Sequence, residues 1–193
     1  WLTMSKLLID LWVKIIWISD SAWAIYNKKG LDVSKIIKLK ELSKSVIEYK
    51  DWKVLDNKEF LIQKCDILIP AALENQITLD NAWEIKAKYI IELANWPITP
   101  EADEILSKNN IIVIPDILAN SWGVIVSYFE QVQNSYNYYW EEVEVNKKLK
   151  EKITRASTQV FYKSQELKTT LRNASYIIAL ERILTAMKQR GEV

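Results

Sequence analysis

The sequence predicts a doubly wound α/β fold with a parallel sheet and a helical C-terminal extension, and two observations carry this prediction. Through residue 116, short apolar runs alternate with segments of helical spacing, and beyond it the apolar pattern is helical throughout. Strands that alternate with helices build parallel sheets, because parallel neighbours need a crossover connection. No linker interrupts the chain, so we expect one domain over residues 1–193, with an α/β core in 1–116 and a helical part in 117–193.

Four nearly continuous apolar runs are the expected strands of the core, since strands buried on both faces carry few polar residues. The helix from Thr99 has proline at its first position, where the missing N–H costs nothing. The strands are expected at 13–18, 67–69, 89–93 and 111–114, a turn at 25–27, and a short helix or loop at 78–85. Helices are expected at 2–11, 32–45, 58–63, 99–107, 118–134, 142–164 and 172–189.

Composition argues against several classes of function. The formal net charge is +1, which provides no basic surface for nucleic acid, and half of the residues are apolar, which argues against disorder. No apolar run is long enough to span a membrane, and no signal-peptide pattern is visible. The absence of histidine excludes imidazole catalysis and His-ligated zinc from this chain, so we expect no metal site. A single cysteine cannot form an internal disulfide, which fits the cytoplasm.

A small-residue turn and a helix follow the last expected strand. Asn120 and Ser121 are predicted to cap this helix, and Gly123 would let a ligand approach its first turn. Val124 and Ser127 are three residues apart and share one helix face. An apolar residue and a hydroxyl at this place are typical of a ligand site beyond a strand end, although the spacing alone also fits an ordinary helix start.

The sequence of this stretch resembles that of the helix that enters the cleft of glutamate dehydrogenases. Residues 120–134 read NSWGVIVSYFEQVQN, and the usual family form is NAGGVTVSYFEWVQN. Residues 65–78, and 92–95 followed by 97–103, match the same family. The resemblance runs almost from end to end and covers only the cofactor-binding half of such an enzyme. It implies a Rossmann-like domain whose first strand, together with an N-terminal catalytic domain, lies upstream of residue 1.

Glycine is scarce and tryptophan abundant, with 3 glycines and 9 tryptophans where ordinary usage predicts roughly 13 glycines. Most of the tryptophans stand where turns or the resembled family would carry glycine, whereas Trp140 matches a family tryptophan. Some bacterial lineages read UGA as glycine, and translation under another code would produce this pattern. We hypothesise that eight positions are glycine in the native protein: Trp1, Trp12, Trp17, Trp23, Trp52, Trp83, Trp96 and Trp122.

Asp20 closes the first visible strand and lies 19 residues beyond Trp1. If Trp1 is the last glycine of a phosphate-binding turn, Asp20 is placed to bind the adenosine ribose hydroxyls. We expect Asp20 and the neighbouring Ser21 to contact the cofactor. An acid here favours NAD over NADP, because it would repel a 2′-phosphate. The alternative is an acidic turn residue.

The resemblance implies further contacts at the later strand ends. Ala71 and Ala72 would let the dinucleotide pass close to the backbone, and Asn95 and Asn120 would bind near the nicotinamide and its ribose, since amides both donate and accept. The alternatives are that Ala71 and Ala72 only begin a helix, and that Asn95 and Asn120 are ordinary turn residues. In the substrate site, Val124 would pack on the aliphatic chain of glutamate, and Ser127 would hydrogen-bond its side-chain carboxylate.

The implied function is reversible oxidative deamination of L-glutamate to 2-oxoglutarate and ammonia with NAD or NADP, in a homo-oligomer that the resemblance suggests is a hexamer. The family's catalytic lysines and aspartate lie in the other domain, so no catalytic residue is expected in this chain. Two alternatives stay open: a leucine- or phenylalanine-type dehydrogenase, and a non-catalytic nucleotide-binding or assembly module. Glu101 and Asp103 are interpreted as first-turn helix acids, and Arg172 and Tyr176 as structural or hinge residues.

Overall fold

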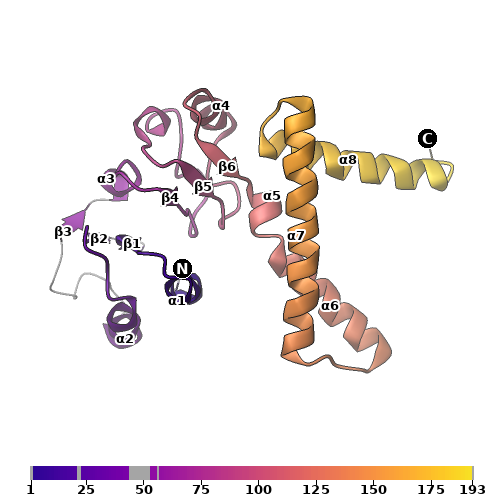
Figure 1. Ribbon diagram of the computed structural model, residues 1–193, viewed down its shortest axis with the longest axis horizontal. Coiled ribbons are helices and arrows are strands. Elements are labelled where there is room, and N and C mark those ends of the chain that lie inside the picture. Colours follow the sequence, from indigo (N-terminus) through magenta and orange to yellow (C-terminus); the bar gives the residue numbers. More distant parts are fainter. Residues whose placement is uncertain (1, 21–22, 44–52, 56, 193) are drawn as a thin grey trace. The chain divides into compact units, whose positions relative to one another are not determined.

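The computed structural model describes residues 2–20, 23–43, 53–55 and 57–192, and Figure 1 shows their helices and strands. The chain divides into two compact units. The first comprises residues 1–65 and 84–86, and the second comprises residues 66–83 and 87–193. Within the described residues, each unit contains one three-stranded sheet.

The sheet of the first unit is antiparallel, in the order β1-β2-β3. Trp17 is paired with Tyr26, and Ile25 with Val54. The elements of this unit are α1 (Leu2–Asp10), β1 (Trp17–Ser19), β2 (Ala24–Tyr26), α2 (Val33–Ser43), β3 (Lys53–Leu55) and α3 (Asn57–Leu61).

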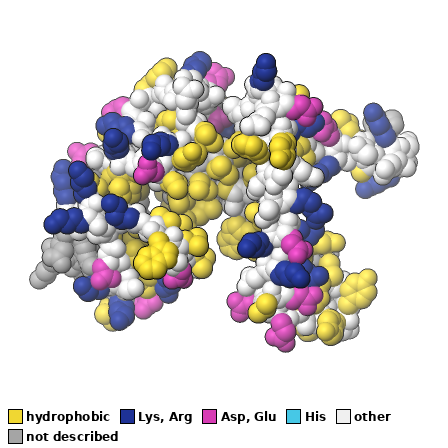
Figure 2. Space-filling model, viewed as in Figure 1, with side chains coloured by type: hydrophobic (Ala, Val, Ile, Leu, Met, Phe, Trp, Pro, Cys, Tyr) yellow, Lys and Arg dark blue, Asp and Glu magenta, His cyan; other side chains and the backbone are white. Residues whose placement is uncertain are grey.

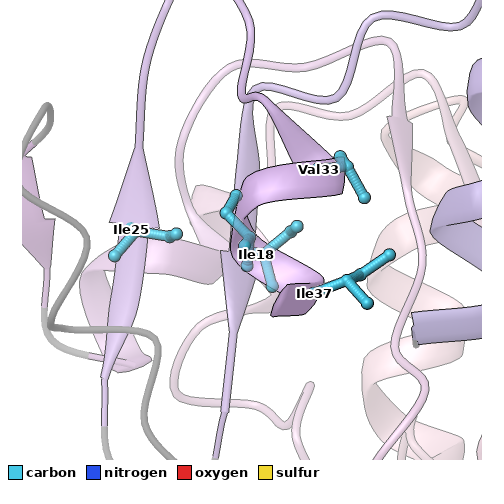
Figure 3. Close-up of a cluster of buried hydrophobic side chains, with 5 residues drawn as sticks. Ile18, Ile25, Val33 and Ile37 are labelled. Carbon is cyan, nitrogen blue, oxygen red and sulfur yellow. The ribbon is translucent and has the colours of Figure 1, made fainter. Parts of the chain in front are cut away.

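Packing of α2 on the sheet forms the core of the first unit. Ile18 of β1 and Ile25 of β2 contact the face of α2 that carries Val33, Ile36 and Ile37; Figure 3 shows this cluster, with Ile18, Ile25, Val33 and Ile37 labelled. Residues three and four apart share a helix face, so this spacing directs all three α2 side chains to the sheet. Burying each of the five contributes about 1.5–3 kcal/mol of hydrophobic stabilisation.

Two predictions for the first unit are wrong. Residues 25–27 were expected to form a turn, but Ala24–Tyr26 is strand β2. The run 13–18 was expected to be a parallel strand, but β1 is shorter and is paired antiparallel with β2. The Asp20 N–H donates to the Trp23 carbonyl (3.0 Å), which closes a connection of only a few residues. So short a connection can join only antiparallel strands.

The sheet of the second unit is parallel, in the order β4-β5-β6, as the sequence predicts. Leu68 is paired with Ile90, and Ile90 with Val113. The Thr99 side chain accepts from the Ala102 N–H, and Pro100 begins α4, which confirms the predicted helix start. The elements are β4 (Ile67–Leu68), β5 (Tyr89–Ile91), α4 (Pro100–Lys108), β6 (Ile112–Ile114), α5 (Asp116–Ala119), α6 (Trp122–Tyr136), α7 (Glu142–Leu167) and α8 (Leu171–Gln189). The short helix η2 (Ala82–Glu84) begins in this unit and ends at Glu84, which is assigned to the first.

The C-terminal helices pack in the same unit as the parallel sheet. Leu118 of α5, Val160 of α7 and Ala174 of α8 form a buried apolar cluster, against which Ile114 of β6 packs. The α7 helix lies beside α5 and α8 (Figure 1). None of the helices in the described part of the chain combines the length and apolarity needed to cross a bilayer.

Two tryptophans occupy backbone positions that favour glycine. Trp12, 96% exposed, follows α1 with φ 61°. Its N–H donates to the Ile9 carbonyl (2.8 Å), and the Val13 N–H donates to the Leu8 carbonyl (3.0 Å). This pattern is the Schellman motif, in which the left-handed residue is usually glycine. Trp96 has φ 51° and is also exposed. Both positions support the glycine hypothesis, and peptide mass spectrometry of the native protein is expected to find glycine there.

Replacing Trp12 by glycine is expected to raise the free energy of unfolding by about 1–2 kcal/mol, because a left-handed backbone strains an L side chain. Trp140→Gly is the matched control and should lower it by about 2–3 kcal/mol. Trp140 packs edge-on against Phe129 with ring centroids 5.5 Å apart, and glycine would lose this contact while keeping the backbone N–H that donates to Gln133 Oε1. Urea unfolding of the intact protein measures both changes, and a loss of stability with Trp12→Gly would contradict the assignment.

Candidate functional site

The loops that follow β4, β5 and β6 meet at one edge of the parallel sheet. Strands that run in parallel end at the same edge, which is where open α/β sheets bind their ligands. Hydrogen bonds tie these loops together. The Leu93 and Ala94 N–H groups donate to the Pro70 carbonyl (3.0 and 2.9 Å), and the Asn75 N–H donates to the Trp96 carbonyl (2.9 Å). The edge is therefore a continuous surface of loop backbone.

The structure brings two predicted site residues into direct contact at this edge. Asn120 Nδ2 donates to Asn95 Oδ1 at 2.6 Å and reaches the Leu93 carbonyl at 3.5 Å. The Asn95 side chain is exposed, and Asn120 is half-buried. Their mutual bond leaves the Asn95 NH₂ to donate and the Asn120 carbonyl oxygen to accept. A carboxamide requires this combination of one donor and one acceptor.

Ala71 and Ala72 follow β4 at the same edge. Ala71 is half-buried and Ala72 is exposed. Because the preceding Pro70 carbonyl accepts the Leu93 and Ala94 amides, these small residues lie beside the loop that carries Asn95. Their methyl groups leave the nearby backbone open to an extended ligand.

The first turns of α6 present the two predicted substrate residues. Val124 is 69% exposed, Ser127 is exposed, and a Cβ added at Gly123 would meet open space. Within the described residues, Ser127 Oγ makes no hydrogen bond, whereas Ser135 on the same helix donates to the Gln131 carbonyl at 2.9 Å. Ser127 therefore retains both its donor and its acceptor capacity for a ligand.

The predicted caps of α6 are wrong. Ser121 stands at the N-cap in a helical conformation, and its hydroxyl donates back to the Leu118 carbonyl (2.7 Å). The expected helix 118–134 is divided into α5 and α6, and neither Asn120 (ψ 2°) nor Ser121 (ψ −14°) between them has the extended backbone of a helix cap. Asn120 does not cap either, and its amide is directed to Asn95.

A buried group of charges lies behind the site and was not predicted as a group. Arg172 of α8 donates to Glu92 (2.8 and 3.0 Å) and to Asp103 (3.0 and 3.2 Å), and its guanidinium lies 3.6 Å from Asp116. Burial raises the pKa of the Glu92 carboxyl above its usual value, and Arg172 offsets part of this rise. Burial lowers the pKa of Arg172, but hydrogen bonds to Glu92 and Asp103 outweigh it and raise the pKa.

These contacts refine two interpretations. Asp103 was interpreted as an acid that favours its own helix start, and it is also an ion-pair partner of α8. Arg172 was interpreted as structural, and it has a buried carboxylate partner at the end of β5. Among the residues that the structure describes, no cluster of three or more His, Cys, Asp or Glu is arranged to hold a metal ion.

Asp20 belongs to the first unit, where its carboxylate already has partners. Its side chain is 7% exposed, it accepts from Lys40 Nζ at 3.0 Å, and it accepts from the Trp23 N–H at 3.1 Å. Asp20 therefore closes the turn between β1 and β2, and a ribose bound here would share this carboxylate with Lys40. Ser21, the other residue expected at the ribose, lies outside the described residues.

Comparisons with known proteins identify the relatives of this chain. The chain is 44% identical over 188 residues to the NAD-specific glutamate dehydrogenase of Staphylococcus aureus strain COL, covering 97% of this chain and 45% of that protein. It is 46% identical over 187 residues to the NADP-specific glutamate dehydrogenase of Synechocystis sp., covering 92% and 44%. The chain thus spans about 45% of the length of the curated relatives that it matches.

Solved structures agree with these sequence relatives. The glutamate dehydrogenase of Peptoniphilus asaccharolyticus matches with a TM-score of 0.84 at 38% identity, over 100% of this chain and 45% of that one. The hetero-hexameric glutamate dehydrogenase of Thermus thermophilus matches with a TM-score of 0.90 at 25% identity, over 98% and 44%. These likenesses confirm the predicted Rossmann-like fold class. The model of the glutamate/leucine/phenylalanine/valine dehydrogenase family matches residues 2–191, and the chain belongs to that family.

Proposed function

We propose that this chain is the cofactor-binding half of an NAD- or NADP-dependent glutamate dehydrogenase. The reaction is the reversible oxidative deamination of L-glutamate to 2-oxoglutarate and ammonia. The observation that carries the proposal is the Asn95–Asn120 pair, held 2.6 Å apart at the carboxyl edge of a parallel sheet, in a chain 44% identical to an NAD-specific relative.

The chemistry of the edge fits a nicotinamide dinucleotide. Asn95 and Asn120 offer the donor and the acceptor that a carboxamide needs, and Ala71 and Ala72 leave room for the ribose and phosphates beside the backbone. We propose separately, from the resemblance, that Asp20 and Ser21 contact the adenosine ribose, with the Asp20 carboxylate shared with Lys40. When bound, the nicotinamide supplies the site that accepts or donates the hydride. The residues of this chain bind and orient the cofactor and substrate.

The exposed face of α6 is proposed to receive the substrate. Val124 would contact the aliphatic part of glutamate, and Ser127 would donate to its distal carboxylate. We propose that proton transfers at the amino group belong to residues outside this chain, since none of the assigned residues is a general base. Closure of the two halves of the enzyme would then exclude water from the reacting atoms.

Assembly and cellular location are part of the same proposal. Exposed aromatic side chains gather where α6 gives way to α7, namely Tyr136, Tyr138 and Tyr139, and Figure 2 shows hydrophobic atoms over this region. Large exposed apolar groups mark surfaces that other chains or domains cover. We infer a cytoplasmic homo-oligomer, with a hexamer as the expected form, and NAD as the favoured cofactor.

A panel of amino acids tests the substrate assignment. In the intact enzyme, kcat/KM for glutamate is expected to exceed that for leucine, phenylalanine and norvaline by on the order of 10²-fold or more, because only glutamate offers Ser127 a side-chain carboxylate. Rates with NAD and NADP give the cofactor preference in the same experiment. A higher kcat/KM for leucine or phenylalanine would assign the enzyme to the other branch of the family. Tight NAD binding without oxidation of any amino acid would indicate a non-catalytic module.

A further inference from the structure

The four charged side chains behind the amide pair form one connected group within the second unit: Glu92, Asp103, Asp116 and Arg172. We call this group the acid–arginine cluster. Glu92 is 0% exposed and Asp116 is 6% exposed. The Arg172 guanidinium is bidentate to Glu92, with Nη1 at 3.0 Å from Oε2 and Nη2 at 2.8 Å from Oε1. A planar fork of this kind fixes the orientation of its carboxylate as well as its distance.

Each inner carboxylate of the cluster also holds loop backbone at the site. Glu92 Oε2 accepts the Asp116 N–H at 2.7 Å, and Asp116 Oδ2 accepts the Trp96 N–H at 2.9 Å. The Asp116 carbonyl accepts the Asn120 N–H at 3.0 Å. Trp96 directly follows Asn95 in the chain, so the cluster is bonded to the backbone beside both members of the amide pair.

The charge balance makes Arg172 the residue on which this arrangement depends. Three carboxylates surround one guanidinium, and without it Glu92 and Asp116 would face each other in a buried place with no cation. Removing one partner from a buried ion pair leaves an uncompensated charge and is strongly destabilising, so the remaining carboxylate either takes up a proton or moves towards water. Movement of Glu92 or Asp116 would release the Asp116 and Trp96 amides and so displace Asn120 and Asn95.

We propose that Arg172 is a positioning residue for the dinucleotide site: from α8, it holds the Asn95–Asn120 pair in the geometry that binds the nicotinamide carboxamide. This inference rests on the proposed function. It extends the site to the C-terminal helix α8. The same Arg172 contacts that attach α8 to the sheet would also affect cofactor binding. Lysine cannot replace Arg172, because a single ammonium cannot match the fork geometry that Glu92 and Asp103 share.

Comparison of two ligands separates positioning from general stability. NAD and ADP-ribose share the adenosine and both phosphates, but only NAD carries the nicotinamide that Asn95 and Asn120 would bind. In the intact enzyme, Arg172→Lys is expected to raise the Kd for NAD about 10-fold and to change the Kd for ADP-ribose less than about 2-fold, both measured by isothermal titration calorimetry. A residue with only a structural role would change both affinities alike or neither.

Two further variants complete the test. Arg182→Lys is the matched control on the same helix, since Arg182 is bonded to the Gln159 side chain at 2.6 Å and touches no member of the cluster; both affinities should stay unchanged. Asp103→Asn removes the outermost carboxylate and should raise the Kd for NAD about 3-fold, with the Kd for ADP-ribose unchanged. This variant tests the proposal even if Arg172→Lys does not fold. Equal changes for the two ligands, or no change in a folded Arg172→Lys protein, would overturn the proposal. If the unmodified enzyme binds NAD no more tightly than ADP-ribose, the nicotinamide contributes nothing to affinity, and the proposed function itself would be overturned.

Discussion

Replacing Ser127 by alanine is expected to lower kcat/KM for glutamate about 10- to 150-fold in the intact enzyme, while the Kd for NAD stays nearly unchanged. The loss of one hydrogen bond to a charged group costs about 1.5–3 kcal/mol, which gives this range. Ser127 is exposed on α6, and its hydroxyl has no hydrogen bond within the described part of the chain. The hydroxyl is therefore available to a carboxylate, and its removal should act on the substrate alone.

Ser135→Ala is the matched control for this prediction. Ser135 lies on the same helix and is also exposed, but its hydroxyl already donates to the Gln131 carbonyl at 2.9 Å. Its removal should leave kcat/KM for glutamate unchanged. Discrimination against norvaline, which lacks the distal carboxylate, should shrink with Ser127→Ala, because only glutamate loses a partner. Equal losses for glutamate and norvaline would contradict the assignment of Ser127 to the substrate.

Replacing Asp20 by serine is expected to lower kcat/KM for NAD and to raise kcat/KM for NADP relative to that for NAD. If Asp20 binds the ribose hydroxyls, losing its charged hydrogen bonds costs about 1.5–3 kcal/mol against NAD. The same change removes a negative charge that lies 3.0 Å from the Lys40 ammonium. A 2′-phosphate is no longer repelled by a carboxylate at this position, so the two effects shift the preference in the same direction. The measurement is the ratio of kcat/KM for NAD to that for NADP.

Asp32→Ser provides the control, because Asp32 is an acid of the same unit that is bonded to Lys35 at the start of α2. It should leave the cofactor ratio unchanged, since serine can also serve as a helix cap. An unchanged ratio in Asp20→Ser would show that this carboxylate only closes the hairpin and binds Lys40. The existence of NAD-specific and NADP-specific relatives makes the ratio an informative quantity for this chain.

The second unit was the more predictable from its sequence, for a physical reason. Its strands are short apolar runs that end at prolines or polar residues, and Pro100 marks the start of α4. The hairpin of the first unit was missed because β2 has only three residues, Ala24–Tyr26, too few to display an alternating pattern. The partner of a strand is set by packing within the whole sheet, so it cannot be predicted from the composition of that strand alone.

The candidate site was predictable where one residue type at a strand end carried the signal. Asn95 and Asn120 are such residues, and the structure joins their amides. The acid–arginine cluster could not be predicted in this way, because Glu92 is 24 residues from Asp116 and 80 from Arg172. The available signal was two acids at strand ends and an arginine at the start of a helix, and only the fold connects them. Trp12 is the opposite case, because the local sequence predicts a left-handed residue after the helix and the backbone there has φ 61°.

The central claim is that the Asn95–Asn120 pair receives the nicotinamide of a dinucleotide. A crystal structure of the intact enzyme with NADH tests it most directly. The claim predicts the nicotinamide carboxamide within about 3 Å of both side chains, donating to Asn120 Oδ1 and accepting from Asn95 Nδ2. A dinucleotide bound with its nicotinamide away from this edge, and with neither amide in contact with it, would contradict the claim.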